Sequence, residues 1–218
     1  MTKQIDKGYF NLRQLLGVVG IALPALVVTI GLLGQNGPEW YFSISATYYT
    51  NSRDLFVGAM VAVGAFLITY SIDGYSRQDD IINRVTGLFA FLIIAFPCGA
   101  TELERVGIFL TPVKVSSILH NISASVFFLL RTYNVLFLFT KSDGQPTKEK
   151  LQRNIVYRIC GAGIVGFMIN QVITSFLALV GPYTLINEAG MLFFDGISWL
   201  VKGGSILRDK TASPVVHL

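Results

Sequence analysis

The chain has 218 residues, of which 52% are hydrophobic and only 14% carry a charge. Soluble domains carry about 25% charged residues, so this composition leaves too little polar surface for a soluble globule. The net charge of +4 does not come from a basic patch, because the lysines and arginines flank long apolar blocks. We therefore expect membrane lipid as a partner and no nucleic acid.

The apolar residues fall in blocks of the length that crosses a hydrocarbon core of ~30 Å at ~1.5 Å per residue. The first block follows Lys3, Lys7 and Arg13, contains Pro24, and is longer than a secretory signal core, so we expect a retained helix. The predicted transmembrane helices lie at about 14–34, 54–73, 80–98, 115–140, 154–180 and 184–203. The predicted fold is all-α: a polytopic integral membrane protein whose residues 1–218 form one six-transmembrane-helix bundle.

The basic residues predict the orientation of these helices. Thirteen lysines and arginines lie in the two termini and in the second-to-third and fourth-to-fifth linkers. The opposite side has three, namely Arg53, Arg105 and Lys114. Because cytoplasmic flanks carry the excess of lysine and arginine, this bias predicts a multi-pass protein of the cell membrane with both termini in the cytoplasm.

Small and amide residues predict contacts between helices. The spacings Gly58-x-x-x-Ala62 and Ala162-x-x-x-Gly166 are of the kind that lets helix backbones approach closely in lipid. Asn170 and Gln171 lie near the middle of the fifth helix, where they would complete a polar interior or form hydrogen bonds across helices.

Ionisable side chains inside apolar helices are costly in lipid and point to a paired or functional role. The fourth helix places six residues at helical spacing on one face: Ser116, His120, Ser123, Phe127, Arg131 and Asn134. Glu188 and Asp195 share a face of the sixth helix, and the depths of Arg131 and Asp195 match. These positions predict a buried Arg131–Asp195 ion pair, which either fastens two helices together or acts as a charge relay.

A second group of polar residues is predicted near the outer surface. It contains Arg53, Asp54, Glu102, Glu104, His120 and Glu188, with Tyr48 and Tyr49 nearby. We predict that it lines an outward-facing polar cavity between the second, fourth and sixth helices and binds a ligand. One version is a divalent metal site in which His120 and Glu188 are ligands together with a second carboxylate. The other interpretation is that His120 is a hydrogen-bonding residue of the core and that the tyrosines belong to an aromatic interface belt.

Two family resemblances bear on function. The layout resembles the Frag/DRAM/Sfk superfamily of six-helix membrane proteins and related uncharacterised bacterial membrane proteins. The resemblance lies in the outer loop SISATYYTNSRDLF, in Asn83 before the third helix, and in His120 at the start of the fourth. This resemblance implies a lipid-associated protein. Ser116-x-x-x-His120 is also similar to the Ser-x-x-x-His motif of alkaline ceramidase-like membrane hydrolases, although this chain lacks their later His-x-x-x-His pair.

Three functional hypotheses follow. The first is an integral membrane protein that binds or handles a lipid or small ligand in the outward-facing polar cavity, using His120, Glu188, Asp54, Arg53 and Glu102, with Arg131 and Asp195 deeper in the bundle. The second is a metal-dependent intramembrane lipid hydrolase, in which a metal-bound water attacks an amide or ester. The third is a small ion-coupled transporter that uses Arg131 and Asp195.

Overall fold

The computed structural model describes residues 7–34, 42–70, 76–100, 103–142, 144–179 and 182–207. Within these ranges the chain forms six α-helices: α1 (Lys7–Leu33), α2 (Arg53–Thr69), α3 (Arg77–Ala95), α4 (Val113–Tyr133), α5 (Lys148–Phe176) and α6 (Tyr183–Lys202). A short 3-10 helix, η2 (Ser45–Tyr49), precedes α2, and a π-helical turn, η3 (Asn134–Leu138), continues α4. The helices overlap the six predicted ranges. The largest differences are the start of α1, at Lys7 instead of residue 14, and the end of α4, at Tyr133 instead of residue 140, although η3 continues α4 to Leu138.

Three of the helical segments are long and apolar enough to cross a membrane: Gly8–Leu33, Val113–Leu138 and Lys148–Phe176. The other helices are shorter or more polar. α2 has 17 residues, α3 begins with several charged side chains, and α6 contains Glu188 and Asp195. Large apolar side chains are exposed along the surfaces of the long helices, among them Leu15, Ile118 and Ile169. Exposed apolar helix faces of this length are suited to contact with lipid and support membrane association.

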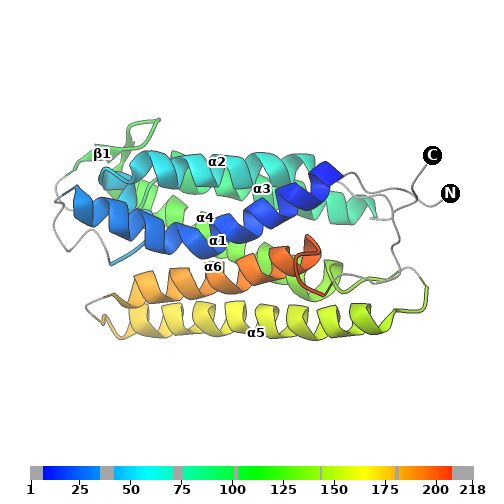
Figure 1. The fold of residues 1–218 in the computed structure, drawn as a ribbon. Helices are drawn as coiled ribbons and strands as arrows, with labels where there is room; N and C mark the ends of the chain where they lie inside the picture. The colour runs from blue at the N-terminus through cyan, green and yellow to red at the C-terminus, as the bar shows by residue number, and fades with distance from the viewer. Residues whose placement is uncertain are drawn as a thin grey trace.

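The helices pack side by side in one bundle (Figure 1). The most extensive pairings join α5 to α6, α1 to α6, α2 to α3 and α3 to α4. Figure 1 shows α5 along one edge of the bundle, α1 and α6 in the middle, and α2 on the opposite side. The last helix therefore lies between the first helix and the fifth.

Glycines permit the closest of these helix contacts. A Cβ atom on Gly196 of α6 would lie 2.7 Å from the carbonyl oxygen of Gly17 in α1, and one on Gly87 of α3 would lie 2.6 Å from that of Gly64 in α2. Such distances are too short for any side chain, so small residues set both crossings. The packing role predicted for Gly58 and Gly166 is wrong, because a Cβ at either position would meet nothing within 4 Å.

The segment before α4 forms a small hairpin that the sequence did not predict. Strands β1 (Arg105–Val106) and β2 (Thr111–Pro112) pair antiparallel, with Arg105 opposite Pro112. The turn between them begins at Gly107, which has a φ of 75° and whose Cβ would lie 2.5 Å from the carbonyl oxygen of Ala95. Only glycine combines that backbone angle with that approach, so Gly107 places the hairpin against the end of α3.

Candidate functional site

The polar face predicted for α4 is buried in the bundle. Ser116, His120, Ser123, Phe127, Arg131 and Asn134 are each less than 5% exposed. This confirms that the face is directed toward protein, because a polar stripe on a membrane helix avoids lipid. Its residues do not form a single site, however, and each end of the face has its own partners.

The predicted ion pair between α4 and α6 is confirmed. The Arg131 Nε and one terminal nitrogen donate to Asp195 Oδ1 at 2.9 and 2.7 Å. The Arg131 side chain is 1% exposed and that of Asp195 is 13% exposed. The guanidinium also lies 4.7 Å from the ring centroid of Trp199, an arrangement that favours a cation. The pair therefore fastens α4 to α6 inside the bundle.

Several buried polar atoms of α3, α4 and η3 have no hydrogen-bond partner in the described chain. They include a terminal nitrogen of Arg131 and both side-chain amide atoms of Asn134 and of Asn83. Asn134 opens the π-helical turn η3, a kind of irregularity that is frequent at functional sites. Buried polar atoms are normally satisfied, so these atoms have unused capacity for hydrogen bonds.

His120 fastens the end of α3 to α4. Its Nδ1 lies 3.0 Å from the carbonyl oxygens of both Ile93 and Phe96. One turn earlier, the Ser116 hydroxyl donates to the carbonyl oxygen of Pro97 at 2.7 Å. The last carbonyls of a helix have no partner in their own helix, so side chains from α4 satisfy them here. This geometry agrees with the interpretation of His120 as a hydrogen-bonding core residue.

Glu188 fastens the segment before η2 to α6. Its carboxylate accepts hydrogen bonds from the hydroxyls of Ser43 and Ser45, at 2.9–3.1 Å, and from the backbone N–H of Ile44. Beside it, the Leu185 N–H donates to the carbonyl oxygen of Phe42 at 2.8 Å. The carboxylate is therefore occupied by neutral donors of the loop, and no hydrogen bond joins it to His120 within the described residues.

The space between the helices differs from the predicted cavity. A small cavity of about 40 Å³ lies among α1, α2, α3, α4 and α6, and its lining is mainly apolar. Glu188 and Ser45 are part of that lining, but His120, Asp54 and Arg53 are not. The cavity among these helices is thus smaller and less polar than the predicted one, and within the described residues it brings Glu188 together with Ser45 but not with His120, Asp54 or Arg53.

A larger pocket lies at the same end of the bundle, between η2, the start of α2 and the β1–β2 hairpin. Its volume is about 450 Å³, and its lining includes Tyr48, Tyr49, Arg53, Arg105 and Gly107. The Arg53 guanidinium lies 4.4 Å from the ring centroid of Tyr48 and donates to its hydroxyl at 2.8 Å. Arg105 donates to the carbonyl oxygen of Leu110 at 3.0 Å. Two guanidinium groups and two phenols thus face one concave surface, which we call the outer pocket.

Hydrogen bonds to neighbouring helices hold the outer pocket in place. The Ser52 hydroxyl donates to the carbonyl oxygen of Val27 at 2.6 Å, and the Asn51 amide to that of Ile30 at 2.9 Å. The Tyr49 hydroxyl donates to the carbonyl oxygen of Cys98 at 2.6 Å. Burial raises the pKa of Tyr49, so this phenol stays neutral and remains a donor at physiological pH. The pocket wall is therefore tied to α1 and to the end of α3.

The predicted metal ligands are not assembled in the described part of the chain. Those residues contain no group of three histidine, cysteine, aspartate or glutamate side chains placed to hold a metal ion. Glu102 lies outside the described residues, and Asp54 is exposed in the first turn of α2. A metal site that includes Glu102 stays a prediction.

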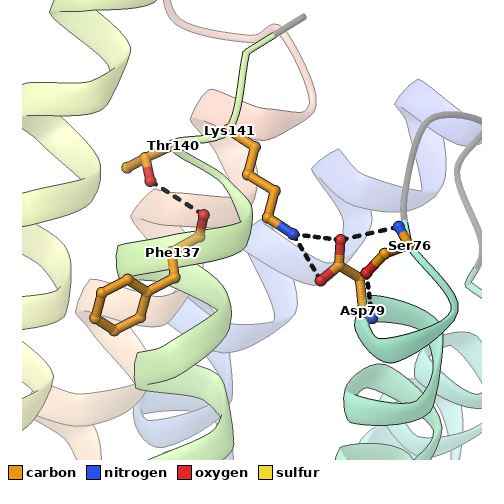
Figure 2. Close-up of polar contacts among 5 residues, drawn as sticks. All are labelled: Ser76, Asp79, Phe137, Thr140 and Lys141. Carbon is orange, nitrogen blue, oxygen red and sulfur yellow. Dashed lines mark hydrogen bonds and ion pairs between the residues drawn. The ribbon is translucent and has the colours of Figure 1, made fainter.

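Two polar networks contain residues that the sequence reasoning did not single out. Asn187 of α6 is fully buried, accepts from Asn170 at 2.7 Å and donates to Gln171 at 3.0 Å, so the amides of α5 form hydrogen bonds across helices. Lys141 contacts both carboxylate oxygens of Asp79 at 2.6–2.7 Å, and Ser76 caps the same helix end (Figure 2). Asn187 could have been found from the sequence, because it is a third amide residue in the helix that directly follows the one with Asn170 and Gln171.

The comparisons with known proteins add no relative to this geometry. No family model, no curated protein and no solved structure matches the chain. The resemblance to the six-helix superfamily therefore remains a prediction from the sequence.

Proposed function

We propose that this chain is a six-span protein of the cell membrane that binds an anionic small molecule or lipid headgroup in the outer pocket. The proposal places all six helices across the membrane, including the shorter α2 and the more polar α3 and α6. Their packing along the three apolar helical segments supports it, since polar side chains such as Arg131 and Glu188 are then shielded by protein.

The observation that carries the ligand proposal is the pair of guanidinium groups in one pocket. No ion pair joins Arg53 or Arg105 to a carboxylate within the described residues, so both can bind an anion. Guanidinium groups bind phosphate and carboxylate in a bidentate manner, and phenols add donors and a flat apolar face. The volume of about 450 Å³ lies within the usual range for small-ligand sites.

The position of the outer pocket favours a ligand at the membrane surface. Arg53, Arg105 and Lys114 are the three basic residues that the charge bias places on the outer side. On that orientation the pocket opens toward the outer leaflet and the exterior. Of the outer polar group predicted from the sequence, Arg53, Tyr48 and Tyr49 line this pocket, while Glu188 binds the segment that leads into η2.

Native mass spectrometry of the full chain, purified in a neutral detergent, tests this proposal. The wild type is mixed with phosphatidylglycerol or with phosphatidylcholine, and the bound lipid is measured. We expect Arg53→Gln and Arg105→Gln each to weaken phosphatidylglycerol binding by about tenfold, since a hydrogen bond to a charged group contributes about 1.5–3 kcal/mol.

Lys114→Gln is the matched control, because Lys114 is an exposed cation at the same end that does not line the pocket. It should leave binding unchanged. Equal losses in all three variants would reduce the effect to general surface charge and overturn the proposal. An unchanged affinity in both arginine variants would do the same.

A further inference from the structure

The turn of the β1–β2 hairpin presents three large apolar side chains to its surroundings. Ile108, Phe109 and Leu110, which we call the apolar tip, are 70%, 64% and 64% exposed. The Phe109 ring has Phe96 on one side, with the ring centroids 5.6 Å apart, yet most of its surface stays open. Adjacent exposed apolar side chains at the end of a hairpin mark a contact with lipid or with another protein.

Hydrogen bonds hold the apolar tip in one conformation. The Leu110 N–H donates to the carbonyl oxygen of Gly107 at 3.2 Å, and the Val113 N–H donates to that of Glu104 at 3.0 Å. The Arg105 guanidinium donates to the carbonyl oxygen of Leu110, also at 3.0 Å. The three apolar side chains are therefore fixed on the outside of the fold by the hairpin that carries them.

Leu110 has a backbone angle that leucine rarely adopts. Its φ is 48°, in the left-handed region where glycine and asparagine are the ordinary residues. Because its side chain is mostly exposed, contacts within the described chain offset little of the strain. An apolar contact from outside the chain would stabilise leucine at this position.

The direction of the hairpin favours lipid as the material that covers the tip. In Figure 1 the hairpin stands out sideways from the bundle at the end where α2 begins, instead of extending along the helix axes. The exposed apolar face of α4 begins directly after the hairpin, with Val115 and Ile118. A tip that points sideways at the end of membrane-length helices lies at the level of the headgroups and the outermost acyl groups.

The base of the hairpin is charged, in contrast to its tip. Glu104, Arg105 and Lys114 flank the apolar tip in the sequence, and all three are exposed. Segments that lie in a membrane interface combine an apolar side that enters the acyl region with a charged side that stays among the headgroups. The long side chains of Arg105 and Lys114 suit this position, because their charged ends can reach lipid phosphates.

We infer that the apolar tip inserts into the outer leaflet of the bilayer. This inference rests on the proposed six-span arrangement. It also deepens the ligand proposal, because the hairpin forms one wall of the outer pocket through Leu103, Arg105 and Leu110. An inserted tip holds that wall at the level of the headgroups, where a membrane lipid reaches the pocket without leaving the bilayer.

Tryptophan fluorescence of the full chain in phosphatidylcholine vesicles tests the insertion. Phe109→Trp places a reporter in the tip, and the emission of the wild type, which contains Trp40 and Trp199, is subtracted. The added emission should be shifted to shorter wavelength, quenched by phosphatidylcholine brominated near the headgroup, and protected from aqueous acrylamide. Because these vesicles contain no anionic lipid, the result does not depend on anion binding in the outer pocket.

Two matched reporters separate this inference from the six-span arrangement. Ile122→Trp, on the exposed face of α4, should be quenched by lipid brominated deep in the acyl chain. Gln145→Trp, in the exposed loop before α5, should be quenched by acrylamide alone. Absence of lipid quenching at both Phe109 and Ile122 would overturn the six-span arrangement itself. Lipid quenching at Ile122, together with acrylamide quenching at Phe109, would overturn the insertion of the tip alone.

Leu110→Asn tests whether apolar side chains cause the insertion. Asparagine adopts a positive φ readily, so the turn should keep its shape. Added to Phe109→Trp, this change should shift the emission to longer wavelength and increase quenching by acrylamide, whereas Leu110→Met should leave both unchanged. Equal lipid quenching with asparagine and leucine would overturn the inference. So would a Phe109→Trp emission at short wavelength that brominated lipid does not quench, since a second copy of the chain would then cover the tip.

Discussion

Three carboxylates at helix contacts are each held by a different kind of donor. Asp195 faces the buried guanidinium of Arg131, Asp79 faces the partly exposed ammonium of Lys141, and Glu188 accepts only neutral donors from Ser43, Ile44 and Ser45. When one member of a buried ion pair is removed, its partner is left as an uncompensated charge. When a carboxylate that binds neutral donors is removed, only unpaired hydroxyl and N–H dipoles are left. The three sites should therefore respond differently to substitution.

The Arg131–Asp195 pair should behave as a coupled unit. Arg131→Met or Asp195→Leu alone should lower the free energy of unfolding by about 3–5 kcal/mol, since each leaves one charge buried without its partner. The double variant should recover most of that loss. Chemical unfolding in mixed micelles measures the cycle, and Lys114→Met gives the cost of removing an exposed cation near the start of α4. Strictly additive losses would show that the two residues act independently.

Asp79 should make part of the folding stability depend on pH. Burial alone would raise the pKa of Asp79, but hydrogen bonds from Lys141 and Ser76 lower it below the ordinary value. A lowered pKa contributes stability above the ordinary carboxyl pKa of about 3.9, and this is lost as the pH falls further. The difference in melting temperature between wild type and Asp79→Asn should therefore shrink below about pH 4. It should correspond to about 1 kcal/mol at neutral pH, because Lys141 is half exposed. A difference that stays constant down to pH 3 would contradict this assignment.

At the scale of elements, the chain uses side-chain bonds to backbone to join helix ends. His120 and Ser116 hold the end of α3, Ser52 and Asn51 hold the end of α1, and Glu188 holds the loop before η2. The sequence predicted the buried polar face of α4 because its spacing follows the helical repeat. It did not predict the partners, since backbone carbonyls of distant helices leave no signal in the sequence. For the same reason it assigned His120 and Glu188 to one cavity.

The hydrogen bonds that Glu188 accepts should protect the segment before η2 from local unfolding. Glu188→Ala should increase hydrogen exchange of the Ile44 amide by at least about tenfold, because a hydrogen bond to a charged acceptor contributes about 1.5–3 kcal/mol. Exchange measured by mass spectrometry in detergent tests this. Asp54→Asn removes an exposed carboxylate at the same end and should leave Ile44 unchanged. Equal exchange in wild type and Glu188→Ala would mean that other contacts hold the loop.

On the scale of the whole molecule, the helix positions follow from apolar blocks of membrane length, and the structure reproduces their number in the described residues. The hairpin and the outer pocket could not be predicted in this way. They depend on the close approach of Gly107 to Ala95 and on the turn that brings Arg105 beside Tyr48, which are tertiary contacts of a polar loop. Likewise, Gly58 and Gly166 fit a packing pattern, yet the contacts fall at Gly64, Gly87 and Gly196.

The orientation predicted by the basic residues concerns the molecule as a whole. A reporter inserted at Gly144, in the exposed turn before α5, should be active only in the cytoplasm, as should one fused after Leu207. A reporter after Glu104, beside the outer pocket, should be active only outside. Pairs of reporters with opposite requirements provide the control for expression. An external signal at Gly144 would reverse the orientation and place the outer pocket on the cytoplasmic side.

The contact between α1 and α6 has a consequence for how the chain is made. Gly17 and Gly20 meet Gly196, so α1 packs along a helix that is synthesised after α2, α3, α4 and α5. Until α6 is made, α1 therefore lacks its most extensive neighbour, and Arg13 lacks the Lys202 carbonyl to which it donates. The groove along α1 is therefore closed only after α6 has been made, so this part of the bundle assembles after α2 to α5 are already synthesised.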